Sequence, residues 1–218
     1  MSTPKFITFT GLDNLTDLKG VFSLSRAYPG KVEWGVLYGG TSNRFPGWDV
    51  LMKLSLDYPE IPRALHLCGP ASQLLMGGFY DRSLAQLCFI RGFGRWQINA
   101  AAYPEPTRVR DRLQRYTEAP GIIQVRGEEF PPPVRGLQYL YDESGGRGRV
   151  ASSWPAPSSL DGRCGYAGGL RPDNVQEVLA RCPAPDDSFW IDMESGVRTG
   201  EDFDLAKCRR VLELVYGR

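Results

Sequence analysis

Short apolar runs alternate with longer amphipathic stretches along the whole chain. The apolar runs cover residues 5–10, 31–38, 63–68, 95–99, 121–125, 136–141, 163–167 and 189–193. Runs that are this short and contain few polar positions are typical of strands buried on both faces. Such strands occur in parallel sheets whose two faces are covered by helices. The pattern therefore predicts an α/β fold.

The amphipathic stretches between these runs predict the helices. They cover residues 15–26, 48–56, 72–90, 105–116, 172–180 and 203–216. Asn14 can cap the first helix, Gly77 and Gly78 can break the third, and Pro172 suits a first helical turn. Eight strand units in one chain favour a closed (β/α)8 TIM barrel over an open sheet, with residues 1–218 as a single domain.

Two links between strands are predicted to be irregular. Residues 126–135 contain three successive prolines, which the interior of a helix does not accommodate. Residues 143–161 are rich in Gly, Ser and Pro. Because this second link follows a strand, it is expected on the catalytic rim of a barrel, as a mobile flap.

Composition and charge narrow the functional classes. The chain has 218 residues, is 42% hydrophobic and carries a formal charge of +1, which indicates neither a nucleic acid nor a membrane as partner. Its five cysteines are widely spaced without a CxxC motif, as expected of reduced thiols rather than a disulfide framework or a zinc site. The start of the chain has no signal-peptide pattern and no apolar run could span a bilayer. We expect a cytoplasmic protein that binds no metal, either a monomer or a homodimer.

The clearest local signals for chemistry follow the last two predicted barrel strands. Gly168 and Gly169 leave the seventh strand, and Ser195 and Gly196 follow the eighth. TIM barrels frequently build a phosphate site from these two loops, because glycine allows the backbone to approach the anion and free N–H groups bind it. The pattern predicts phosphate binding by these four residues, although Gly168 and Gly169 could also serve a plain strand-to-helix turn.

Three segments at the end of the chain resemble one known family. AGGLRPDNVQEVL, WIDMESGVR and FDLAKCRRVLELV are similar, in this order, to the closing third of phosphoribosylanthranilate isomerase. TGLDNLTDL and LYDESGGRG extend the resemblance to the opening and the middle of the chain. That family is a TIM barrel of tryptophan biosynthesis, and it performs an Amadori rearrangement of a phosphorylated aminosugar without a cofactor.

The resemblance implies roles for several residues. Asp142 matches the general acid that protonates the furanose ring oxygen, and Asp192 matches an aspartate near the substrate amine. Arg44 lies where the family binds the anthranilate carboxylate, and Gln97 is a weaker match near the substrate. Each also has a structural interpretation: Asp142 could cap a turn, Asp192 could be hydrogen-bonded inside the barrel, Arg44 could be an exposed loop charge, and Gln97 could be a packing residue.

The position of the family's catalytic base departs from the pattern. Thr10 stands where the family has a cysteine, and a threonine hydroxyl has no comparable route to an anion. Asp13 and Cys68 are the alternative candidates, while His66 is expected to be a buried core residue. Asn99, Glu194 and Arg198 are further departures.

The resemblance therefore implies an isomerase that moves a proton within a phosphorylated sugar or its amino conjugate, with the exact substrate left open. The alternative is a catalytically inactive barrel that binds a phosphosugar or a partner protein.

Overall fold

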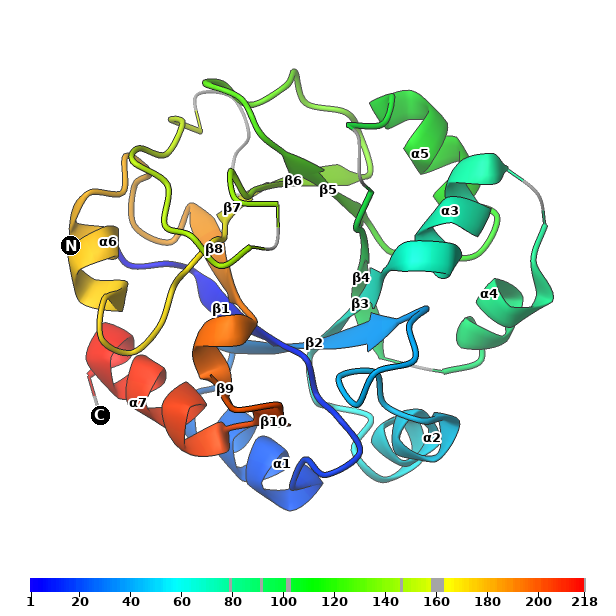
Figure 1. The fold of residues 1–218 in the computed structure, drawn as a ribbon, viewed down its shortest axis with the longest axis horizontal. Coiled ribbons are helices and arrows are strands. Elements are labelled where there is room, and N and C mark those ends of the chain that lie inside the picture. The colour runs from blue at the N-terminus through cyan, green and yellow to red at the C-terminus, as the bar shows by residue number, and fades with distance from the viewer. Residues whose placement is uncertain (79, 91, 101–102, 146, 158–162, 218) are drawn as a thin grey trace.

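Eight parallel strands close into a barrel, which Figure 1 shows end-on inside a ring of helices. The computed structural model describes residues 1–78, 80–90, 92–100, 103–145, 147–157 and 163–217. The strands are β1 (Phe6–Thr10), β2 (Val32–Tyr38), β3 (Arg63–Leu67), β4 (Phe93–Ile98), β5 (Gly121–Val125), β6 (Leu137–Tyr141), β7 (Cys164–Tyr166) and β8 (Phe189–Met193). They pair in sequence order, and β8 closes the ring against β1. The predicted (β/α)8 barrel is confirmed.

Helices cover the outside of the barrel. They are α1 (Leu18–Ala27), α2 (Trp48–Asp57), α3 (Gly69–Gly77), α4 (Arg82–Leu87), α5 (Pro106–Leu113), α6 (Val175–Ala180) and α7 (Leu205–Tyr216). A 3-10 turn, η1 (Ser195–Val197), and a hairpin of β9 (Arg198–Thr199) and β10 (Asp202–Phe203) lie between β8 and α7. In the described residues of the two links expected to be irregular, no helix follows β5 or β6.

Two details of the helix predictions change, and one is confirmed. The first helix begins at Leu18 and is capped by Asp17, whose carboxylate accepts from the Lys19 N–H; the predicted cap Asn14 instead accepts from the Gly47 N–H at 2.7 Å. The predicted break at Gly77–Gly78 is confirmed, because α3 ends there with Gly78 at φ 78°. Pro172 does not open a helix; it lies in the turn before α6.

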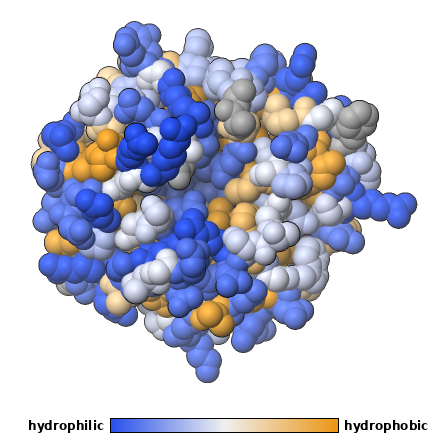
Figure 2. Space-filling view, viewed as in Figure 1, coloured by the Kyte–Doolittle hydropathy of each residue, from blue (hydrophilic) through white to orange (hydrophobic). Residues whose placement is uncertain are grey.

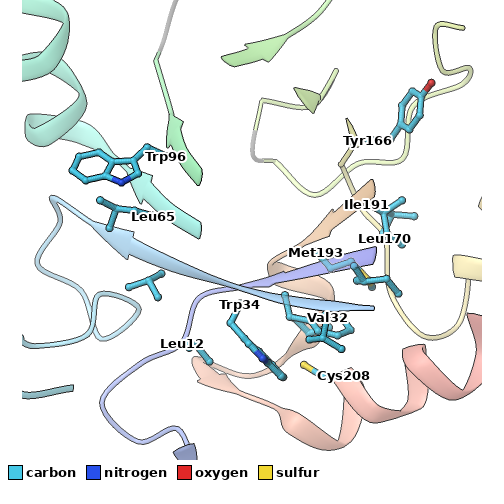
Figure 3. Packing of buried hydrophobic residues seen from close by; sticks show 14 of the residues in the cluster. Leu12, Val32, Trp34, Leu65, Trp96, Tyr166, Leu170, Ile191, Met193 and Cys208 are labelled. Atoms are coloured by element: carbon cyan, nitrogen blue, oxygen red, sulfur yellow. The ribbon is translucent and has the colours of Figure 1, made fainter. Parts of the chain in front are cut away.

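The largest part of the core lies between the barrel wall and the helices. Figure 3 shows Trp34 on β2 and Cys208 on α7 in this layer, both completely buried. The barrel interior holds a separate small apolar cluster of Ile122, Leu140, Ala167 and Trp190. Because successive strand residues face opposite sides, one face of each strand packs against helices while the other fills the barrel.

A charged pair is buried inside the barrel beside that cluster. Arg95 on β4 is hydrogen-bonded to Glu33 on β2 and to Gln138 on β6, and its guanidinium lies 4.3 Å from the centre of the Trp190 ring. These partners satisfy both buried charges, as buried ions require. The interior toward the strand starts is therefore filled, which leaves the opposite end for a ligand.

Candidate active site

The cavity lies at the carboxyl ends of the strands, the end at which TIM barrels carry out catalysis. In Figure 2, which has the orientation of Figure 1, hydrophilic residues surround a hollow near the centre of this face. Strand residues that line the cavity are Thr10, His66, Gln97, Gln124, Leu140, Asp192 and Met193. Loop residues that line it are Arg44, Asn99, Asp142, Ser144, Gly145, Gly148, Ala167, Gly168, Gly169, Leu170, Glu194 and Ser195. Most of the predicted site residues are thus brought together.

Asp192 is the most strongly perturbed acid of this cavity. The Thr10 hydroxyl donates a hydrogen bond of 2.8 Å to Asp192 Oδ1, and both side chains are buried. Burial raises the pKa of the Asp192 carboxyl to about 8, with a further increase from the nearby charges of Glu194 and Glu33. The carboxyl is therefore largely protonated at neutral pH and becomes a carboxylate in the slightly alkaline range.

His66 faces the other oxygen of the same carboxyl. Its Nε2 lies 3.9 Å from Asp192 Oδ2, which is too long for a hydrogen bond. Burial, with the positive charge of Arg95, lowers the pKa of His66 to about 3, so the ring is neutral and the contact is not an ion pair. Within the described residues the buried His66 Nε2 has no hydrogen-bond partner. The expectation of a buried histidine is right, but the side chain also lines the cavity.

Asp142 lies directly after β6, where the sequence placed the general acid. Its side chain is 4% exposed and accepts a 2.8 Å hydrogen bond from the Ser144 hydroxyl. A Cβ added at Gly168 would lie only 3.1 Å from Asp142 Oδ1, so the absence of a side chain there keeps the acid close to the glycine loop. Asp142 therefore borders both the cavity and the predicted phosphate site.

The two predicted phosphate loops touch each other. A Cβ at Gly196 would lie 1.9 Å from the Leu170 carbonyl oxygen, so only glycine allows this contact between the β7 and β8 loops. Gly168 and Gly169 have φ values of 102° and 64°, in the left-handed region that favours glycine. Among the described residues, no acceptor is found for the N–H groups of Gly168, Gly169, Ser195 or Gly196. Gly168, Gly169 and Ser195 line the cavity, while Gly196 holds the two loops together behind it.

The link between β6 and β7 covers this corner. A Cβ at Gly169 would meet the Val150 amide nitrogen at 2.6 Å, so residues 148–150 lie directly over the glycine loop. Trp154 stacks on Tyr166 of β7 with ring centroids 4.5 Å apart, and the Tyr166 hydroxyl donates to the Pro155 carbonyl. The link is on the catalytic rim, as predicted; its last residues, 158–161, lie outside the described residues, and its mobility stays a prediction.

Arg44 reaches the cavity from the loop after β2. It forms ion pairs with Glu194 at 3.1 Å and with Glu201 at 3.5 Å. Glu194 follows β8 and also lines the cavity. The Arg44 guanidinium is therefore shared with two carboxylates, so a substrate carboxylate that binds there must compete with them.

A short chain of polar contacts connects Gln97, Asn99 and Cys68. The Gln97 amide donates to Asn99 at 2.8 Å, and the Asn99 amide donates to Cys68 Sγ at 3.2 Å. Burial raises the pKa of the Cys68 thiol to about 11, and Cys68 is not among the residues that line the cavity. The expectation that Cys68 could be the base is corrected, because its thiol stays protonated near neutral pH.

Asp13, the other alternative base, points away from the cavity. Its carboxylate binds Arg198 at 3.1 Å and accepts from the Phe203 N–H at 3.0 Å, while Thr16 donates to its other oxygen. Arg198 also donates to the Gly11 carbonyl and is almost completely buried. Asp13 is therefore a structural partner of Arg198, and its expected place at the cavity is corrected.

Comparison with known proteins identifies the family. No family model matches the chain. N-(5'-phosphoribosyl)anthranilate isomerase of Zygosaccharomyces bailii is 32% identical over 174 residues, which are 72% of this chain and 78% of that protein. The chain belongs to the phosphoribosylanthranilate isomerase family. The structure of N-(5'-phosphoribosyl)anthranilate isomerase from Pyrococcus furiosus has the same fold, with a TM-score of 0.58 and 16% identity over 98% of this chain and 99% of that one.

The family pattern did not include every residue at the cavity. Gln124, Ser144 and Glu194 line it and were not predicted as site residues. The position of Gln124 gave a usable signal, because a polar residue two places after Ile122 on the same strand shares its inward face. Ser144 and Glu194 lie in loops, where the sequence alone does not fix the direction of a side chain.

The structure gives no sign of a metal site or a disulfide among the described residues. In the parts of the chain that the structure describes, no three or more His, Cys, Asp or Glu side chains gather as they would around a metal ion. The five cysteines are free thiols. None of the described helices combines the length and apolar character needed to cross a membrane.

Proposed function

We propose that this chain is a phosphoribosylanthranilate isomerase-like enzyme, which converts a phosphorylated aminoaldose into the corresponding aminoketose. One observation carries the proposal: a single cavity contains the glycine loop, Ser195 and two buried carboxyl groups, Asp142 and Asp192. A phosphosugar needs one anion site to fix its end. Its isomerisation needs one acid and one base near the reacting carbons.

The phosphate binds where the β7 and β8 loops meet. The N–H groups of Gly168, Gly169 and Ser195, which have no acceptor among the described residues, donate to its oxygens. Asp142 is close to Gly168, so it acts on the ring oxygen of a furanose whose phosphate is held there. Arg44 and Gln97 also line the cavity, and in this proposal they bind the group attached to the sugar nitrogen.

The reaction is tested directly with purified protein and phosphoribosylanthranilate. We expect conversion to the aminoketose in vitro and growth of a tryptophan auxotroph that lacks the isomerase. A purified, folded protein that binds phosphosugars without converting phosphoribosylanthranilate would support the inactive binding barrel or another aminosugar phosphate as substrate.

The phosphate site is tested with a matched pair of variants at Ser195, an exposed residue that lines the cavity. Ser195→Asp places a negative charge beside the proposed phosphate, whereas Ser195→Asn changes size equally without the charge. Ribose 5-phosphate should raise the melting temperature of the wild type and of Ser195→Asn, but not of Ser195→Asp. Equal shifts in all three proteins would place the phosphate elsewhere.

A further inference from the structure

Thr10 is the residue that the sequence resemblance matches to the family's catalytic cysteine, and the orientation of its side chain is fixed by packing. A Cβ at Gly35 on the neighbouring strand would lie 2.2 Å from Thr10 Oγ1, so the hydroxyl rests directly on the glycine backbone. From there it donates to Asp192 Oδ1 at 2.8 Å. A carboxyl oxygen of Asp192 is therefore within hydrogen-bond distance of the place where a thiolate would act.

We propose that Asp192 is the general base that takes the proton from the sugar carbon next to the imine, and that Thr10 is a positioning residue for it. This inference rests on the proposed function and names the base for the same cavity. Asp192 is supported by exclusion as well, since Asp13 binds Arg198 and Cys68 is held as a thiol by burial.

Two orphaned polar atoms show that the floor of this cavity is built for a ligand. His66 Nε2 and Gln97 Oε1 are buried and have no hydrogen-bond partner among the described residues, and both side chains line the cavity. Buried polar atoms are normally paired, because leaving one unpaired destabilises the fold. Sugar hydroxyls can satisfy both atoms, and His66 faces the same carboxyl as Thr10. A bound sugar is therefore held against Asp192.

Two carboxyl groups are enough to supply and accept every proton that the reaction moves. Asp142 gives a proton to the ring oxygen as the C1–O bond breaks and the nitrogen lone pair forms the iminium. Asp192 then takes the C2 proton; the C–H electron pair forms the C1–C2 double bond, and the iminium pair returns to nitrogen. Asp192 returns its proton to C1 while the C2 hydroxyl gives one to Asp142, which leaves the ketone and restores both groups.

The surroundings of Asp192 match this task. The charged and titratable groups that act on it come from four other barrel strands and from the end of its own: Glu33 and Glu194 raise its pKa, Arg95 and the Thr10 hydrogen bond lower it, and His66 is neutral. Burial is the largest influence, and the resulting value of about 8 makes the carboxylate far more basic than an exposed aspartate. A base is most effective when its pKa lies near the working pH.

The experiment compares two isosteric substitutions in one cavity, Asp192→Asn and Asp142→Asn, with phosphoribosylanthranilate that carries hydrogen or deuterium at ribose C2. We expect each variant to lose about 10²- to 10⁴-fold in kcat. Only Asp192→Asn should raise the isotope effect, because removal of the C2 proton then limits the rate.

In the wild type, kcat/KM should rise with pH through about 8. Thr10→Val should move this rise to higher pH, because it removes the hydrogen bond that lowers the pKa.

The outcomes separate the base from the function. Suppose that the wild type is active and that Asp192→Asn keeps more than a tenth of its kcat with an unchanged isotope effect. This result overturns Asp192 as the base and leaves the proposed function intact. The wild type could instead exchange the C2 proton of ribose 5-phosphate in D2O without converting phosphoribosylanthranilate. If Asp192→Asn abolishes this exchange, the result overturns only the proposed substrate. A wild type that does neither overturns both. Ribose 5-phosphate should still raise the melting temperature of both variants, which shows that they fold and bind.

Discussion

Asp192→Asn should make the protein more stable, and the gain should grow with pH. The carboxyl is buried, and this burial raises its pKa from an ordinary 3.8 to about 8. Below pH 3.8 the group is protonated both folded and unfolded, so it leaves the free energy of unfolding unchanged. As the pH rises from there to about 8, the unfolded chain releases the proton while the folded protein keeps it. Stability therefore falls across this window.

The size of the effect follows from the shift. Each pKa unit corresponds to about 1.4 kcal/mol, so the wild type loses on the order of 5 kcal/mol between pH 4 and pH 8 through this one group. Asparagine has the same shape and cannot ionise, and its carbonyl oxygen still accepts from Thr10. The variant does not lose this unfolding free energy as the pH rises. The difference in unfolding free energy between the two proteins should therefore increase with pH and level off above about pH 8.

Urea unfolding at a series of pH values measures this difference, and the buried Trp34, Trp96 and Trp190 report unfolding by fluorescence. Asp57→Asn is the matched control, because it removes one carboxylate from an exposed position at the end of α2. The reasoning fails if the gain of Asp192→Asn is the same at pH 5 and pH 8, or if the control shows an equal rise.

Three further variants test the surrounding structure. Gly196→Ala forces a methyl group within 1.9 Å of the Leu170 carbonyl oxygen, so the β7 and β8 loops must separate. Calorimetry should then show at least a tenfold weaker affinity for ribose 5-phosphate. Unchanged affinity would mean that Gly196 does not hold the two loops together. Asp13→Ala removes the carboxylate partner of the buried Arg198 charge, which then keeps only backbone carbonyl acceptors. The unfolding free energy in urea should fall by about 3–5 kcal/mol, and a loss below about 1 kcal/mol would contradict the structural role of Asp13. Trp154→Ala removes the stack on β7 and should raise KM about twofold to tenfold with kcat retained; a loss of kcat alone would argue against a covering role.

The barrel itself was predictable because its signal is repeated. All eight strands overlap the predicted apolar runs, since most strand residues are buried on both faces and the sequence reflects this. Helix starts were less predictable. Both Asn14 and Asp17 are good capping residues, and only the packing of the loop, in which Asn14 bonds to Gly47, decides that Asp17 caps α1.

The site was predictable where backbone position alone sets the chemistry. Asp142, Asp192, Gly168 and Gly169 follow or end barrel strands, so a correct strand assignment already places them at the mouth. Asp13 was misplaced because its direction depends on a partner 185 residues away, Arg198, which the sequence presents only as a departure from the family.

Thr10 and Arg198 are best explained together as changes that redistribute charge around the barrel mouth. Arg198 neutralises Asp13, which removes that carboxylate from the choice of base. Thr10 is a neutral hydrogen-bond donor, so Asp192 is the one ionisable group of this pair. A thiolate beside Asp192 would add a negative charge and raise the carboxyl pKa further, whereas the hydroxyl lowers it. Thr10→Cys therefore tests whether the base is the residue at position 10 or Asp192. If Asp192 is the base, the cysteine should move the alkaline rise of kcat/KM to higher pH. The plateau of kcat/KM should not increase.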